Sequence, residues 1–264
     1  NNPDLTPRVI TIDVSDDATP ACKVSTVSTV NINAKNDCPI VDLNTNSTSD
    51  FSTIFVEQGA KVNVTSSNVS ITDVDNTTQN WTAKVELTNA VSLDSLFSTV
   101  TVAGFTVNPV SYTSGKVTVN ITGTGTGADL ASIVKGITYK SGSLNPDVTT
   151  RNIVVSISDD SSCTATANST ITINLVNDAS SLTLDDNNSA GTFKNTDFQT
   201  TFTEQTTAVN IGDVDTKITD VDNTTQSSAT ITLTNKKAGD IIQVGALTGG
   251  IIASYDSSQV GKVV

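Results

Sequence analysis

The hydrophobic positions of this chain fall mainly in short runs in which apolar and polar residues alternate, and Gly, Asn, Asp and Ser separate these runs. Alternation with a period of two is typical of antiparallel strands that bury one face. The clearest runs are 62–64, 81–87, 117–121, 152–157 and 169–175. Segment 128–135 differs, because Leu130, Ile133 and Val134 share one face of a helix. The pattern predicts an all-β chain of antiparallel β-sandwiches with a short helix per unit.

The chain also repeats itself at long range. Residues 71–79 and 218–226 carry the identical string Ile-Thr-Asp-Val-Asp-Asn-Thr-Thr-Gln, and a second block at 2–37 recurs at 145–178. Self-similarity at a fixed period indicates tandem structural units. We therefore predict three parts: residues 1–39 as the end of one repeat, 40–180 as a complete repeat, and 181–264 as the beginning of a third.

Composition narrows the possible partners and the core. Hydrophobic residues make up 36% of the chain and aromatic residues 4%, so the cores must be built mainly from Val, Ile and Leu. The net charge of −13 disfavours nucleic acid and anionic membranes, which require basic patches. No segment has the ~20 apolar residues needed to span a bilayer. Without an initiator Met or a signal-peptide pattern, we expect a longer protein whose N-terminus lies upstream.

The residue types argue against an enzyme. The chain has no His, which removes Ser-His-Asp and Cys-His nucleophile systems. Paired carboxylates can hydrolyse glycosides, but here the pairs recur with the repeat, which is unexpected for one active site. The Gly-rich run 123–127 lacks the Lys of a phosphate-binding loop and is expected to form a flexible turn.

Carboxylates cluster as short pairs, among them Asp16-Asp17, Asp73-Val74-Asp75 and Asp220-Val221-Asp222. Any single pair is explained by turn chemistry, whereas a recurring set of hard oxygen ligands indicates a divalent cation such as Ca²⁺. An EF-hand that starts at Asp73 is excluded, because position six is not Gly and position twelve is Lys84. Asp213-Val214-Asp215 is an extra pair in the third part, and the sequence leaves open which of its two pairs binds.

Nine Asn-x-Ser/Thr sequons indicate a secreted, glycan-coated surface in a host with the machinery to modify them. The candidate glycosylation sites are Asn46, Asn63, Asn68, Asn76, Asn80, Asn120, Asn168, Asn187 and Asn223.

Three motifs together resemble cadherin-like tandem repeats of the bacterial and proteoglycan type found in large cell-surface proteins. They are Arg-x-Ile-x-Val-x-x-x-Asp-Asp at 151–160, Thr-Ile-x-Ile-x-x-Val-Asn-Asp at 170–178, and the helix followed by Gly-Ile-Thr-Tyr at 136–139. The resemblance implies a Ca²⁺ site at each junction between repeats. The implied first-junction ligands are Asp4, Asn36, Asp37, Asp73, Asp75, and Asp159 or Asp160; those of the second are Glu57, Asp147, Asn177, Asp178, Asp220 and Asp222.

The three cysteines are too far apart for a zinc knuckle, and mixed Cys/His zinc sites are unavailable. Cys22 and Cys163 occupy equivalent repeat positions, while Cys38 lies in the linker. In the arrangement implied by the resemblance, Cys38 lies beside the top of the complete repeat, so we predict a Cys38–Cys163 disulfide. Cys22 would pair with an upstream linker. Three unpaired thiols are the alternative, and Ala179 denies the second junction this link.

These expectations favour a non-enzymatic extracellular protein of the cell surface. The first hypothesis is the repeat region of a glycosylated filament or stalk, stiffened by calcium between neighbouring repeats and able to self-assemble. A second is a set of spacer repeats in a calcium-dependent adhesin whose binding module lies elsewhere. A third is a carbohydrate- or self-binding module, for which Trp81, Tyr112, Tyr139 and Tyr255 provide little exposed aromatic surface.

Overall fold

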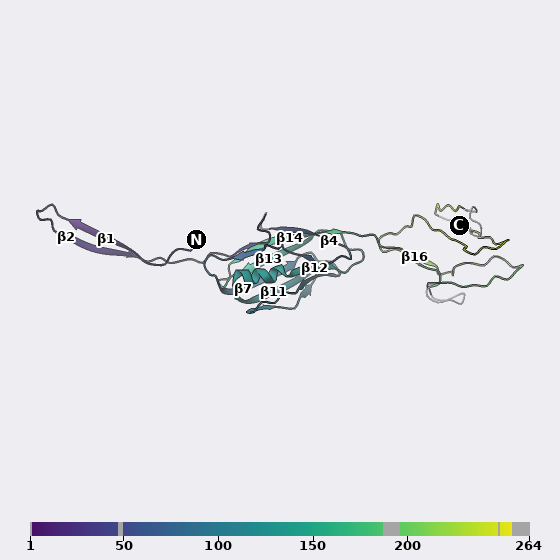
Figure 1. Cartoon of the computed structure of the whole chain (residues 1–264), viewed down its shortest axis with the longest axis horizontal. Coiled ribbons are helices and arrows are strands. Elements are labelled where there is room, and N and C mark those ends of the chain that lie inside the picture. The colour runs from purple at the N-terminus through teal and green to yellow at the C-terminus, as the bar shows by residue number, and fades with distance from the viewer. Residues whose placement is uncertain (1, 47–49, 187–195, 248, 255–264) are drawn as a thin grey trace. The chain divides into compact units, whose positions relative to one another are not determined.

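The computed structural model describes residues 2–46, 50–186, 196–247 and 249–254 (Figure 1). The chain forms two compact units, Asn1–Asn177 and Asp178–Val264. The predicted all-β class is confirmed, and α1 (Gly127–Lys135) is the one helix among the described residues. The division at residues 39 and 180 remains a prediction.

The first unit begins with an antiparallel hairpin of β1 (Arg8–Ser15) and β2 (Lys23–Val30). Every residue of both strands is exposed. In this exposure the two strands differ from the rest of the unit, which has a buried core.

The main sheet of the first unit has seven strands. Its order is β10-β11-β7-β13-β14-β4, with β9 also paired to β11. The bounds are β4 (Phe51–Val56), β7 (Gln79–Leu87), β9 (Phe105–Val107), β10 (Ser111–Thr113), β11 (Lys116–Gly125), β13 (Arg151–Ser158) and β14 (Thr164–Asn174). All pairings are antiparallel except that of β14 with β4, which is parallel.

Smaller sheets complete this unit. One has the order β5-β12-β8, and the other pairs β3 with β6. The bounds are β3 (Ile40–Asp42), β5 (Val62–Asn63), β6 (Ser70–Thr72), β8 (Asp94–Ser98) and β12 (Ile137–Ser141). Side chains along a strand point alternately inward and outward, and the inward ones form the core. In β7, for example, Trp81, Val85 and Leu87 are buried.

Helix α1 follows β11 and packs its apolar face into the same core. Leu130, Ile133 and Val134 are fully buried. A capping box starts the helix: the Thr126 hydroxyl accepts from the Asp129 backbone N–H, and the Asp129 carboxylate accepts from the Thr126 N–H. The Thr126 hydroxyl also donates to Asp129 Oδ2 at 2.7 Å; this bond first, and the bond from the Thr126 N–H second, lower the pKa of Asp129.

The glycine run 123–127 is not the flexible turn that the sequence suggested. Gly123 and Gly125 belong to β11, and Gly127 opens α1. A Cβ on Gly125 would lie 2.5 Å from the ring of Phe105, and one on Gly127 would lie 2.2 Å from the Ile71 carbonyl oxygen. The glycines are therefore needed for close packing.

A buried polar cluster joins three strands of this unit. Arg151 Nε donates to Asp94 at 2.6 Å, and the Tyr139 hydroxyl donates to the other Asp94 oxygen at 2.7 Å. The Arg151 and Asp94 side chains are both fully buried. Arg151 also donates to the carbonyls of Asp147 and Thr149, so its charge is well satisfied.

The second unit has two strands among its described residues, β15 (Ser181–Thr183) and β16 (Lys217–Thr219). They pair as β3 and β6 do: Leu182 lies opposite Ile218, as Val41 lies opposite Ile71. No helix among the described residues is long and apolar enough to span a membrane.

Candidate metal centres

Residues 36–37, the predicted linker of the first junction, are held by two carboxylates of the first unit. The Asn36 side-chain amide donates to Asp159 Oδ2 at 2.9 Å, and the Asp37 backbone N–H donates to Asp75 Oδ2 at 2.5 Å. These bonds bring Asn36, Asp37, Asp75 and Asp159 together, as the predicted ligand set requires.

Asp73 lies in the same loop and shapes it. One Asp73 oxygen accepts from the Asp75 backbone N–H at 2.8 Å, and the other accepts from the Gln79 side-chain amide at 2.9 Å. Asp75 Oδ1 is buried and has no hydrogen-bond partner among the described residues. The loop therefore turns by ordinary Asp chemistry and also carries an oxygen able to bind a cation.

The structure distinguishes Asp159 from Asp160, which the sequence left as alternatives. Asp159 is buried and also accepts from the Cys163 backbone N–H at 2.8 Å. Asp160 is exposed, and its contact is with the Ser161 hydroxyl. Asp159 is the member of the pair that faces the linker.

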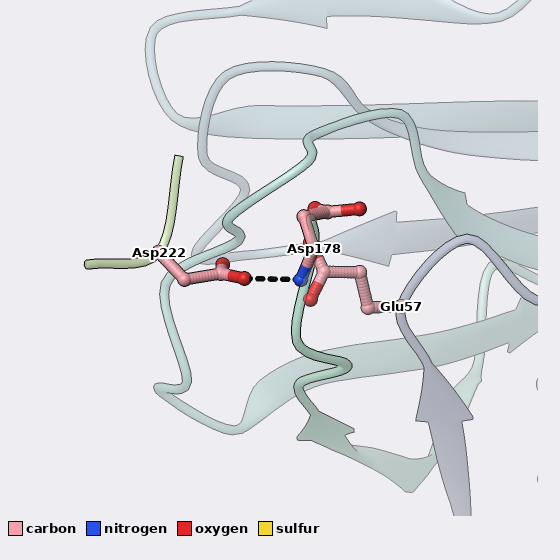
Figure 2. Close-up of side chains that lie close together, drawn as sticks. All are labelled: Glu57, Asp178 and Asp222. Carbon is pink, nitrogen blue, oxygen red and sulfur yellow. Dashed lines mark hydrogen bonds between the residues drawn. The ribbon is translucent and has the colours of Figure 1, made fainter. Parts of the chain in front are cut away.

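The second unit repeats the linker contact of the first junction. Figure 2 shows the Asp178 backbone N–H donating to Asp222 Oδ2, at 2.5 Å. Asp222 N–H donates to Asp220 Oδ1 at 2.9 Å, and the Gln226 amide donates to Asp220 Oδ2 at 3.4 Å. Hydrogen bonds, first that from the Asn223 backbone N–H, lower the pKa of Asp220. Asp222 Oδ1 is a further buried oxygen without a hydrogen-bond partner among the described residues.

Glu57, drawn in Figure 2, follows β4 and is 2% exposed. Its Oε2 accepts from the Val176 backbone N–H at 2.9 Å, while Oε1 is buried without a hydrogen-bond partner among the described residues. An ionised carboxylate with an unsatisfied buried oxygen is costly unless a cation or a proton compensates it. Val176 immediately precedes the predicted ligands Asn177 and Asp178.

Asp4 and Asp147, both predicted as ligands, take part in local hydrogen bonds. Each closes a small turn, since Asp4 Oδ1 accepts from Thr6 N–H at 2.8 Å and Asp147 Oδ1 accepts from Thr149 N–H at 2.7 Å. Hydrogen bonds from Thr6, first that of its backbone N–H, lower the pKa of Asp4. Hydrogen bonds from Thr149, first that of its side chain and then that of its backbone N–H, lower the pKa of Asp147. The nearby Arg8 and Arg151 donate to the Asp4 and Asp147 carbonyls. That either residue binds a cation stays a prediction.

One cluster of acidic residues was predicted only in part from the sequence. Asp185 and Asp213 are buried, and with Asp215 they place ligand oxygens within 4.8 Å of one another. Asp213 N–H donates to the Leu184 carbonyl at 2.8 Å, as Ser66 N–H donates to the Leu43 carbonyl. The Asp213-x-Asp215 spacing was the sequence signal, whereas Asp185 is brought in by the pairing of β15 with β16.

The structure contains a disulfide between Cys38 and Cys163, the pair predicted from sequence, with 5.1 Å between the Cα atoms. Cys22 is a free, exposed thiol. Its N–H donates to Asp16 as that of Cys163 donates to Asp159, both at 2.8 Å, so the two cysteines are structurally equivalent.

Eight of the nine sequon asparagines lie among the described residues, and Asn187 lies outside them. Asn68 is half-buried and accepts from the Ser66 hydroxyl, whereas the other seven are exposed. Exposure permits modification at those seven positions, and glycosylation itself stays a prediction.

Comparison with known proteins gives remote structural neighbours. No protein-family model and no curated protein matches the chain. Among solved structures, a protocadherin gamma B7 fragment with extracellular cadherin domains 1–4 matches 97% of this chain and 47% of its own length, at 12% identity and a TM-score of 0.35. The protocadherin gamma B4 extracellular domain matches 67% of this chain and 22% of its own length, at 14% identity and a TM-score of 0.32. The chain thus spans less than half of each neighbour, and TM-scores this low carry no further argument.

Proposed function

We propose that this chain is the repeat region of an extracellular, glycosylated surface filament or stalk whose junctions are stiffened by Ca²⁺. Residues 40–180 would be the complete repeat, and 1–39 and 181–264 parts of its neighbours. The observation that carries the proposal is the recurrence of one linker contact: Asp37 N–H on Asp75 and Asp178 N–H on Asp222.

The chemistry of the donor set fits a hard cation. Asp75, Asp222 and Glu57 each retain a buried carboxylate oxygen with no hydrogen-bond partner among the described residues. Ca²⁺ accepts six to eight oxygens from carboxylates, amides and waters, and it would neutralise carboxylates gathered in a strongly acidic chain.

The proposed ligands form two sets. At the first junction they would be Asn36, Asp37, Asp73, Asp75 and Asp159; at the second, Glu57, Asn177, Asp178, Asp220 and Asp222. When bound, Ca²⁺ would supply electrostatic crosslinking between the linker and the Asp-x-Asp loop. The chain's own hydrogen bonds hold that loop in place.

Spacer repeats of a calcium-dependent adhesin are the second candidate, because the same stiff junctions would serve either role. A carbohydrate-binding module needs exposed aromatic rings, and few are available here. Trp81 and Tyr139 are buried, and among the described Trp and Tyr residues only Tyr112 is exposed, at 63%.

Calcium titration of the whole chain by calorimetry, with small-angle scattering in Ca²⁺ and in chelator, tests the proposal. Asp75→Asn and Asp222→Asn should each weaken binding at one junction, since each removes a charge from the ligand set. Asp160→Asn is the matched control, because Asp160 is exposed. Unchanged scattering in chelator, or equal binding by all three variants, would contradict the proposal. Electron microscopy of the native assembly separates a regular polymer from isolated stalks with distinct tips.

A further inference from the structure

The Cys38–Cys163 disulfide lies beside the proposed ligands of the first junction, and each of its ends is a few residues from one of them. Cys38 directly follows Asp37, whose N–H donates to Asp75 Oδ2 at 2.5 Å. Cys163 ends a tight turn that starts at Asp159. The Cys163 N–H donates to Asp159 Oδ1 at 2.8 Å, and the Asp159 N–H donates to the Cys163 carbonyl at 3.1 Å. The disulfide therefore connects two segments that each carry a proposed ligand.

A hydrogen bond and the disulfide join these two segments at two points. The Asn36 side-chain amide donates to Asp159 Oδ2 at 2.9 Å, and two residues later Cys38 is bonded to Cys163. Asp37 lies between these two connections in the sequence. Its backbone is thus held on both sides against the turn that contains Asp159.

The hydrogen bonds alone would hold residues 36–37 weakly. Each of them replaces a bond that the same groups make with water, so the net gain per bond is small. Asn36 is exposed, and water therefore competes directly for its bond to Asp159. A disulfide does not exchange with water, and it keeps the two segments together whenever the hydrogen bonds open.

The second unit repeats the linker contact without the covalent link, because Ala179 stands where the first unit has Cys38. The next residue substitutes for it in part, since the Ser180 hydroxyl donates to Asp220 Oδ2 at 2.9 Å. This bond can open, and it uses an oxygen of a proposed ligand. The first ligand set is therefore the more firmly positioned one, and the second is an internal reference that lacks the link.

We propose that Cys38 and Cys163 are positioning residues for the first calcium site, and that their oxidation state sets its affinity. The inference rests on the proposed calcium function and concerns its regulation. Ca²⁺ binds to the arrangement in which the linker and the Asp-x-Asp loop are together, so the apparent dissociation constant rises as fewer chains have that arrangement. Reduction should lower this fraction to about one tenth or less, which weakens binding at least about 10-fold.

The change requires a thiol reductant and alters no calcium ligand. Cys38 is exposed and Cys163 is half-buried, so a small dithiol can reach the bond. The dithiol gives up two electrons and two protons and becomes a cyclic disulfide. The S–S bond of the chain breaks, and each cysteine sulfur gains one electron and one proton. A change in calcium affinity would therefore come from the position of the ligands alone.

Calorimetric Ca²⁺ titration of the whole chain, with and without dithiothreitol, tests the proposal. Asp222→Asn weakens the second site, so this chain reports mainly the first, and reductant should raise its dissociation constant at least about 10-fold. The Asp75→Asn chain reports mainly the second site and should not respond. Cys22→Ser is the matched control and should keep the wild-type response, because Cys22 is a free, exposed thiol.

The titration separates this inference from the function on which it rests. Equal Ca²⁺ affinities of the first site in the two redox states overturn the inference and leave the calcium proposal standing. Absence of Ca²⁺ binding in every chain contradicts both.

The reverse effect provides a readout that a purely structural disulfide would not give. If the bond tightens Ca²⁺ binding about 10-fold, saturating Ca²⁺ must favour the disulfide by the same factor, which lowers its reduction potential by about 30 mV. Equilibration in graded mixtures of oxidised and reduced dithiothreitol, followed by alkylation and mass mapping of Cys38, measures this shift. Asp75→Asn should abolish it. No shift in the wild-type chain, or an equal shift in Asp75→Asn, overturns the inference.

Trp81 fluorescence distinguishes the local effect from unfolding. Trp81 is 2% exposed in the core of the first unit, so its native emission should be retained in dithiothreitol. Loss of that emission together with calcium affinity would show that the bond holds the whole core and would overturn the inference. The double variant Cys38→Ala/Cys163→Ala lacks the bond without any reagent and should reproduce the weak affinity of the reduced chain. Wild-type affinity in this variant also contradicts the proposal.

Discussion

Replacement of Asp94 should strongly lower the free energy of unfolding of the first unit. Its carboxylate accepts from Arg151 at 2.6 Å, from Tyr139 at 2.7 Å and from the Val91 N–H at 3.0 Å. Asp94→Ala leaves a fully buried guanidinium with the exposed Asp147 carboxylate, 3.7 Å away, as its remaining counter-charge, and leaves the Tyr139 hydroxyl without its acceptor. Breaking a buried pair from one side costs about 3–5 kcal/mol, and the orphaned hydroxyl raises the total toward the upper end.

Urea unfolding measures this effect in the right place. Trp81 is the single tryptophan and is 2% exposed in the same core, so its fluorescence reports on this repeat. With a slope of about 2 kcal/mol per molar, the urea midpoint of unfolding should fall by about 1.5–2.5 M. Lys116→Gln, which removes an exposed partner of Glu86, is the control and should cost less than about 1 kcal/mol.

Two results would refute this reasoning. A midpoint shift for Asp94→Ala as small as that of the control would mean that the pair contributes no more than a surface contact. An Asp94→Ala/Arg151→Met double variant as unstable as the sum of the single changes would show that the penalty does not come from the unpaired charge.

Other predictions concern the same repeat. Burial first, and the hydrogen bond to Asp94 second, raise the pKa of Tyr139; the stability this represents is fully present below the unfolded pKa of about 10 and is lost as the pH rises above it. Tyr139→Phe should therefore flatten the alkaline loss of stability seen by urea unfolding, and an unchanged slope would count against the assignment. Reduction, or Cys38→Ser, opens a link across 125 positions and should cost roughly 4–5 kcal/mol by the chain-entropy model; equal unfolding midpoints with and without reductant would contradict this. Thr126→Ala removes the cap of α1 and should cost about 1 kcal/mol, whereas the exposed Ser132→Ala, measured in parallel, should be nearly neutral.

Local patterns were sufficient to predict much of the fold. The alternation at 81–87 and 152–157 predicted β7 and β13, because a strand's side chains alternate between faces whatever its neighbours are. The three-residue apolar face of 128–135 likewise predicted α1. The glycine run 123–127 misled, since glycine marks both a turn and a close approach, and only the position of Phe105 separates the two.

The candidate site divides in the same way. By itself the sequence determined that the Asp-x-Asp loops and the linker Asn-Asp pairs recur, because a recurring string is read from the chain without any knowledge of its neighbours in space. The tertiary structure decided that Asp159 and not Asp160 meets the linker, that Asp4 and Asp147 close turns, and that Asp94 meets Arg151 across 57 positions. Those contacts depend on which strands become neighbours. The packing of the whole core determines this, and the spacing of residues along one segment does not predict it.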